Sequence, residues 1–161
     1  MIKQFCAWLS NTPMSQYIQD TFWMIPTVQT VHIVSIAIVM TSMAMLDFRL
    51  IGIAGRRQSL TEVGNRFLPW VWVTLVILLC SGTLLIIAEP GRELINNVFW
   101  LKMSLLVGAI VLTLVFQTML HRRSGFWEHH RSASILLGSA SLLMWVGIVG
   151  AGRWIAYVEH G

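Results

Sequence analysis

Four long apolar stretches follow one another along the chain, and charged residues gather between them. Each stretch has the roughly 20 apolar residues that a helix needs to cross a bilayer core about 30 Å thick. None alternates apolar and polar positions as a barrel strand does, so all four are predicted to be helices. The predicted spans cover residues 25–48, 67–88, 99–120 and 133–157.

The composition supports a membrane location, because 56% of the residues are hydrophobic and 11% are charged. Soluble domains contain about 25% charged residues. We therefore predict one all-α domain over residues 1–161, an integral membrane four-helix bundle with a short N-terminal interfacial helix between Lys3 and Tyr17. No apolar core of a signal peptide precedes Trp23, so the first span is expected to act as an uncleaved anchor.

Basic residues are concentrated in two of the three connections between spans. The first and third connections carry seven of the nine arginines, whereas the N-terminus, the second connection and the C-terminus carry four of the seven acidic residues against Lys3 and Arg92. By the positive-inside rule, the arginine-rich connections face the cytoplasm and both termini face outward, which in a bacterial inner membrane means the periplasm. The arginines are Arg49, Arg56, Arg57, Arg66, Arg122, Arg123 and Arg131, and the acidic residues are Asp20, Glu89, Glu93 and Glu159. The net charge of +4 then reflects topology and anionic lipid, and no pattern for nucleic acid is present.

His32 is the strongest candidate for chemistry, because an ionisable side chain inside a span is costly unless it faces protein or binds something. It lies seven residues into the first predicted span, roughly 10 Å deep at the rise of a helix. One interpretation is a histidine that hydrogen-bonds a neighbouring helix for packing. The other is an axial ligand to heme b, since helical bundles commonly hold heme iron through a neutral imidazole.

Two cations lie at a similar depth in other spans. Lys102 and Arg153 are three or four residues below the outer ends of spans three and four, roughly 5 Å deep. They are placed to hold heme propionates, or alternatively to extend towards lipid headgroups. Gly82 in span two is at the level of His32 and would let a flat macrocycle approach the backbone. Its neighbour Cys80 is more typical of a buried structural cysteine than of a second axial ligand.

Other metal patterns in the sequence are weaker. His129 and His130 lie in the third connection near Glu128 and His121, and Met40 with Met43 suggests a copper-binding pair. Cys6 is expected at the surface and Cys80 in mid-span, so no disulfide between them is predicted. His121 should close the inner end of span three, too far from His32 to share a ligand.

Two local features have structural interpretations. Asp47 and Arg49 are expected to form an ion pair at the inner end of span one. Gly147 and Ala151 have the small side chains that permit close helix contact, within the bundle or in a homodimer.

Several short motifs, in order, cover nearly the whole chain after residue 20. They are His32, the run Asp47-Phe48-Arg49-Leu50-Ile51-Gly52, Pro69-Trp70, Glu89-Pro90, Phe99 with Lys102, and Gly152-Arg153-Trp154-Ile155-Ala156-Tyr157. In these the sequence resembles a largely uncharacterised family of small four-span bacterial inner-membrane proteins. By analogy it is also similar to copper-resistance D membrane domains and small b-type cytochromes. The resemblance implies the four-span topology.

Two functions follow from different classes. The first is a heme b protein for electron transfer or heme-linked sensing, with His32 on the iron and a quinone or a periplasmic electron carrier as partner. The second is a cofactor-free transporter of a small solute or metal, or an accessory subunit of a larger membrane complex. Motifs for hydrolysis or nucleotide binding are absent from the sequence, so any enzymatic activity is expected to be redox chemistry.

Overall fold

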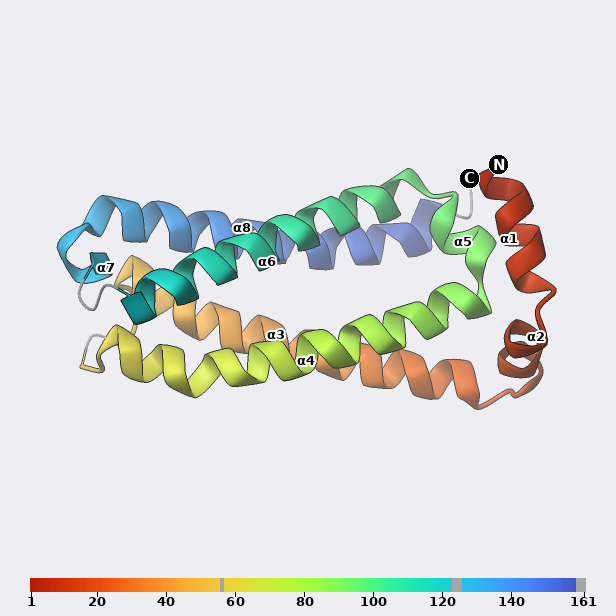
Figure 1. Ribbon diagram of the computed structural model, residues 1–161, viewed down its shortest axis with the longest axis horizontal. Coiled ribbons are helices and arrows are strands. Elements are labelled where there is room, and N and C mark those ends of the chain that lie inside the picture. Colours follow the sequence, from red (N-terminus) through yellow and green to blue (C-terminus); the bar gives the residue numbers. More distant parts are fainter. Residues whose placement is uncertain (56, 123–125, 159–161) are drawn as a thin grey trace.

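The computed structural model describes residues 1–55, 57–122 and 126–158, with the backbone alone for residues 126, 128 and 155–158. Within these residues the chain is helical and has no strand. Its long helices are α3 (Met24–Ile51), α4 (Leu60–Ala88), α6 (Asn97–Arg122) and α8 (Arg131–Val158). They run antiparallel in a bundle (Figure 1), and all four are long and apolar enough to cross a membrane. The predicted all-α membrane bundle of four helices is confirmed.

The helices extend beyond the apolar stretches that predicted them, because their ends have capping groups of their own. α4 begins at Leu60 rather than at Phe67. The Ser59 hydroxyl accepts a hydrogen bond from the Glu62 amide at 3.2 Å, and the Glu62 carboxylate accepts one from the Ser59 amide at 2.9 Å. Such a capping box satisfies two amides that would otherwise lack partners. α3 continues to Ile51 and ends at Gly52, whose φ of 84° is the left-handed conformation that favours glycine.

Three short helices cover one end of the bundle, called here the terminal end (Figure 1). These are α1 (Ile2–Ser10), α2 (Pro13–Asp20) and α5 (Pro90–Leu94). α2 completes the end of α4, because Ser15 Oγ donates to the Ile87 carbonyl and Gln19 Nε2 donates to the Ala88 carbonyl, both at 2.7 Å. The N-terminal segment is thus two helices, where the sequence predicted one.

The expectation that Cys6 lies at the surface is wrong. α1 folds back onto α5, so the Cys6 side chain is buried, with its sulfur 3.5 Å from the Pro90 carbonyl. Cys80, in contrast, is exposed on the outside of α4, and both cysteines are free thiols. Position along the chain predicts how deep a residue lies, but not how α4 is rotated or how α1 packs. These two features bury Cys6 and expose Cys80.

The opposite end, called here the arginine end, contains α7 (Phe126–His129) and the loops that join α3 to α4 and α6 to α8. Arg49, Arg57, Arg66, Arg122 and Arg131 lie at this end. Arg56, Arg123 and Glu159, which contributed to the predicted charge asymmetry, lie outside the described residues.

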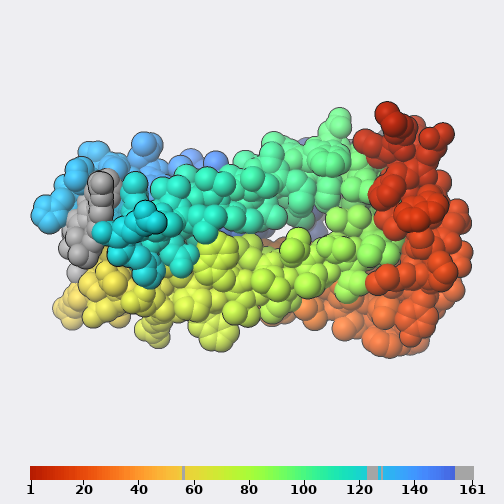
Figure 2. All heavy atoms as spheres, viewed as in Figure 1, coloured from red at the N-terminus to blue at the C-terminus, as the bar shows by residue number. Residues whose placement is uncertain are grey.

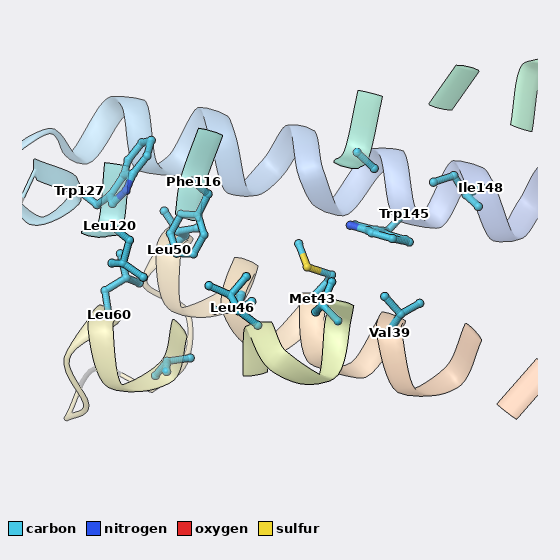
Figure 3. Packing of buried hydrophobic residues seen from close by; sticks show 14 residues of the cluster. Val39, Met43, Leu46, Leu50, Leu60, Phe116, Leu120, Trp127, Trp145 and Ile148 are labelled. Carbon is cyan, nitrogen blue, oxygen red and sulfur yellow. The ribbon is translucent and has the colours of Figure 1, made fainter. Parts of the chain in front are cut away.

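The hydrophobic core occupies the half of the bundle nearer the arginine end. Leu46 and Leu50 of α3 face Phe116 and Leu120 of α6, and Trp127 closes this end of the core (Figure 3). Towards the terminal end the cluster stops at three residues, Val39 of α3 and Trp145 and Ile148 of α8. Before Val39, α3 has a single buried residue, Ser35. The two halves of the bundle are therefore packed very differently.

Close helix contacts explain where this packing is tight. A Cβ added at Gly138 of α8 would lie 3.2 Å from the Asp47 carbonyl oxygen of α3, so the two backbones touch at this point. α4 and α6 meet where Gly64 faces Leu120 and where Trp72 Nε1 donates to Gln117 Oε1 at 2.9 Å. Nearer the terminal end, the pair α3–α4 and the pair α6–α8 separate (Figure 1).

Candidate functional site

His32 lies on α3 in the loosely packed half of the bundle and is half-buried. Its Nδ1 is 2.7 Å from Ser81 Oγ on α4, so the imidazole contributes to the contact between these two helices. Ser81 itself is buried. This hydrogen bond is the contact that the packing interpretation required, and its geometry also bears on the ligand interpretation.

The second contact of Ser81 determines which imidazole nitrogen carries the proton. Ser81 Oγ is 2.7 Å from the Ile77 carbonyl oxygen, and two oxygens at this distance need a hydrogen between them. A serine has one hydroxyl hydrogen, so it is donated to Ile77, and Ser81 accepts from His32. We infer that Nδ1 is protonated and that Nε2 has its lone pair available. Metal-binding histidines have this arrangement, with the other ring N–H donated to a fixed acceptor.

Gly82 contacts His32 directly. A Cβ added at Gly82 would lie 3.4 Å from His32 Cε1, which is ordinary van der Waals contact. Gly82 therefore leaves room for the edge of the imidazole. The surface of Gly82 expected to lie against a macrocycle is instead in contact with His32.

An opening separates the two helix pairs on the terminal side of the core. Figure 2 shows it between α4 and α6 in the space-filling view. On α6, no residue between Phe99 and Ala109 is buried, and on α4 the only buried residues beyond Thr74 are Ser81 and Ala88. Leu78, Leu105 and Leu106 are among the partly buried residues where the core ends. These leucines are apolar, and Figure 2 shows that side chains do not fill the space between the helix pairs.

Lys102 of α6 lies on the other side of this opening. It is half-buried, and its charge acts on His32, which connects the two helix pairs electrostatically. The Glu93 carboxylate of α5 attracts the same ammonium group. Lys102 also packs against α8, since a Cβ added at Gly152 would lie 3.9 Å from its Nζ.

Arg153 follows Gly152 on α8, and its side chain is exposed. Lys102 and Arg153 thus lie on adjacent helices towards the terminal end, and Lys102 contacts Gly152, the residue before Arg153. The aromatic residues that follow Trp154 in this motif lie outside the residues whose side chains are described.

Among the described residues, no three histidine, cysteine, aspartate or glutamate side chains gather where they would hold a metal ion. His121 is at the arginine end, where its Nδ1 is 2.8 Å from the Gln117 carbonyl. His129 and His130 are exposed at that end as well. Among the histidines that the structure describes, only His32 is in the open half of the bundle, and these residues offer a metal bound there no set of three ligands.

Asp47 departs from its predicted role. It forms no ion pair with Arg49, because residues two apart on a helix point to different sides. Its side chain is 1% exposed and faces Ser141 of α8. This contact lacks good hydrogen-bond geometry, so Asp47 Oδ2 and Ser141 Oγ are without a partner among the described residues. At 100° per residue the sequence also places Asp47 with Ser35 and Ser42 on one broad polar face of the helix, and all three are buried.

The four long apolar helices define a multi-pass membrane protein of the four-helix class. The family model of DUF6644, a family of unknown function, matches residues 5–158. The chain belongs to this family. No curated protein and no solved structure shows significant similarity to it.

Proposed function

We propose that this protein binds heme b in the terminal half of the bundle, with His32 as an axial ligand, and that it serves in electron transfer or heme-linked sensing. The observation that carries the proposal is the position of His32. Its Nδ1 is fixed by Ser81, its Nε2 lone pair is available, and it lies in the loosely packed half of the bundle, where Figure 2 shows an opening between the helix pairs.

A single protein ligand favours heme over a bare metal ion. Structural zinc sites need four protein ligands and catalytic zinc sites three. A porphyrin supplies four equatorial nitrogens of its own, so one imidazole is enough to anchor its iron. A solute pathway or a helix of a partner subunit would also fill the opening, but neither requires a histidine with this tautomer.

The charges at the terminal end of the opening would suit the two propionate groups at one edge of heme. Lys102 and Arg153 supply two cations there, and cations beside carboxylates form strong charge-assisted hydrogen bonds. Glu93 already attracts Lys102, so a propionate would share this lysine with α5. Because the terminal end is expected to face the periplasm, a quinone or a periplasmic carrier is the proposed redox partner.

Bound heme would supply one-electron redox chemistry, and the chain would tune it. Ser81 would fix the orientation and basicity of His32, since outer partners of metal ligands control both. The apolar residues of the opening would keep water away. Cys80 is exposed on the outside of α4, which leaves it away from the opening as a second ligand. We therefore propose His32, and not Cys80, as the iron ligand among the described residues.

Absorbance spectra of the detergent-purified protein, air-oxidised and then dithionite-reduced, test the proposal together with a pyridine hemochrome assay. A stoichiometric b-type signal is expected, and His32→Ala should remove it while the protein remains in the membrane. His121→Ala is the matched control and should leave the spectrum unchanged. A colourless wild-type protein from cells supplied with heme would contradict the proposal and favour a transporter or an accessory subunit.

A further inference from the structure

A cavity at the arginine end has no part in the proposed heme site. Its volume is about 160 Å³, and it lies between the end of α3, the start of α4 and the start of α8. The lining includes Arg49, Gly52, Leu60, Trp127, Arg131 and Ser134. Two arginines from different helices thus line one hollow, and no carboxylate lines it among the described residues.

Two glycines in left-handed conformations make room for these arginines. Gly52 has φ of 84°, and the Arg131 guanidinium lies 3.4 Å from the position where its Cβ would be. Gly55 has φ of 71°, and Arg49 Cδ lies 3.3 Å from the corresponding point. A side chain at either glycine would be strained and would press on an arginine. The loop after α3 therefore positions both guanidinium groups.

The two arginines keep most of their donors available. Arg49 uses its Nε for the Gln58 carbonyl at 2.8 Å, which fixes the plane of the guanidinium group. Its two terminal nitrogens, and all the donors of Arg131, have no hydrogen-bond partner among the described residues. A planar guanidinium offers paired N–H groups that match the oxygens of a phosphate.

Membrane topology alone does not explain this arrangement. The positive-inside rule requires arginines in the loops but not their convergence on a cavity. Arg57 and Arg122 are exposed and line no part of it, and Arg66 lies over the Phe67 ring at 5.7 Å. Trp127 forms an apolar wall and packs on Phe116 with 5.9 Å between the ring centroids. Such a wall beside two cations suits an anionic group that is attached to an apolar body or lies at the edge of one.

We propose that this cavity binds a phosphate group through Arg49 and Arg131. The source is either the headgroup of an anionic phospholipid or a soluble phosphate compound. At the expected cytoplasmic surface, anionic lipids are abundant and attract basic residues.

The test uses the full-length protein in nanodiscs of phosphatidylcholine, with and without phosphatidylglycerol. Native mass spectrometry measures retained phosphatidylglycerol, and calorimetry measures binding of inorganic phosphate in discs of phosphatidylcholine alone. Arg131→Gln and Arg49→Gln should each weaken binding about tenfold or more, the effect of losing hydrogen bonds to a charged group. Arg122→Gln and Arg57→Gln, which remove equal charge at the same end, should leave it within about twofold.

The outcomes separate the two sources. Retained phosphatidylglycerol that depends on Arg49 and Arg131 supports the site with lipid as its occupant, whereas phosphate binding with the same dependence supports a soluble ligand. Absence of both, or equal losses in the control variants, overturns the proposal. If Arg49→Gln fails to fold because the Gln58 contact is lost, Arg131→Gln decides alone, since its side chain is exposed.

Discussion

At the scale of single residues, the hydrogen bond between Ser81 and His32 is the feature with the most direct consequence for function. It joins a buried hydroxyl to a half-buried imidazole, and it determines which nitrogen is available. If His32 is the iron ligand, Ser81 controls that ligand without touching the iron. A substitution of Ser81 should alter the properties of the bound heme as well as the stability of the protein. Its effect on the ligand can therefore be separated from its effect on helix packing.

Ser81→Ala should reduce heme affinity by about 10-fold to 100-fold, the usual effect of removing an outer partner of a metal ligand. It should also shift the midpoint potential, because the imidazole loses its fixed orientation. Heme titration followed by absorbance, and potentiometry of the bound form, measure the two effects. Thr83→Ala is the matched control, since this exposed hydroxyl on the same helix donates only to its own backbone. An unchanged affinity and potential in Ser81→Ala would show that the contact serves packing alone.

The residues of this site differ in how far the sequence determined them. The depths of His32 and Lys102 followed from the helical rise, and the structure brings the two within electrostatic reach across the opening. Their lateral contacts did not follow, because these depend on how each helix rotates about its axis. Ser81 and Glu93 were therefore missed as partners, and Asp47 was assigned an ion pair that its burial excludes. The helical spacing of Ser35, Ser42 and Asp47 indicates which side of α3 faces the bundle, but it does not indicate which residue of another helix each side chain meets.

At the scale of elements, the bundle depends on a close approach between α3 and α8. Gly138 allows it, because a Cβ there would lie 3.0 Å from Ile51 Cγ1 and 3.2 Å from a backbone oxygen. Helices in membranes gain little from the hydrophobic effect, so close packing through small residues is a main source of association. The sequence suggested Gly147 and Ala151 for such a contact, and a Cβ added at Gly147 would lie 3.4 Å from Leu105 Cδ1 of α6, while Ala151 is buried. The contact of α8 with α3 at Gly138 was not predicted.

Gly138→Ala should destabilise the bundle by about 1–3 kcal/mol, since the extra methyl group forces α3 and α8 apart. Gly150→Ala in the same helix is the control, because no atom lies within 4 Å of its added Cβ. Alanine there should be neutral or stabilise by up to about 1 kcal/mol through helix propensity. Unfolding in mixed micelles by a denaturing detergent, followed by circular dichroism, compares the two. Equal stability of the variants would mean that the helices do not depend on this contact.

At the scale of the whole molecule, charge asymmetry predicts how the bundle lies in the membrane. The arginine end should face the cytoplasm and the terminal end the periplasm. Single cysteines at Gln58 and at Gly91, in a background with both native cysteines replaced by alanine, test this in whole cells. A membrane-impermeant maleimide should label the cysteine at position 91 and leave the one at position 58 unlabelled until the cells are lysed. The reverse pattern would place the proposed heme site on the cytoplasmic side.

The unequal packing of the two halves makes a second prediction about the whole molecule. Regions with few buried contacts open more often, so without heme the terminal halves of α3 and α6 should exchange their amide hydrogens faster than the halves around Leu46 and Phe116. A ligand that binds only the folded state stabilises it by about 2.7 kcal/mol at 100 times its dissociation constant. Heme at that concentration should therefore slow exchange in the terminal halves up to roughly 100-fold.

Hydrogen exchange with mass spectrometry resolves the two halves of each helix, and the His32→Ala variant with added heme supplies the control. Its terminal half should remain in fast exchange, because heme that only dissolves in the micelle gives no specific protection. Uniform slowing of all four helices would indicate non-specific association. If the terminal half is already as protected as the core without heme, the opening is closed in the membrane and the argument for a cofactor between the helix pairs fails. Protection that is confined to the terminal half and depends on His32 would show that heme binds in the loosely packed half through this histidine.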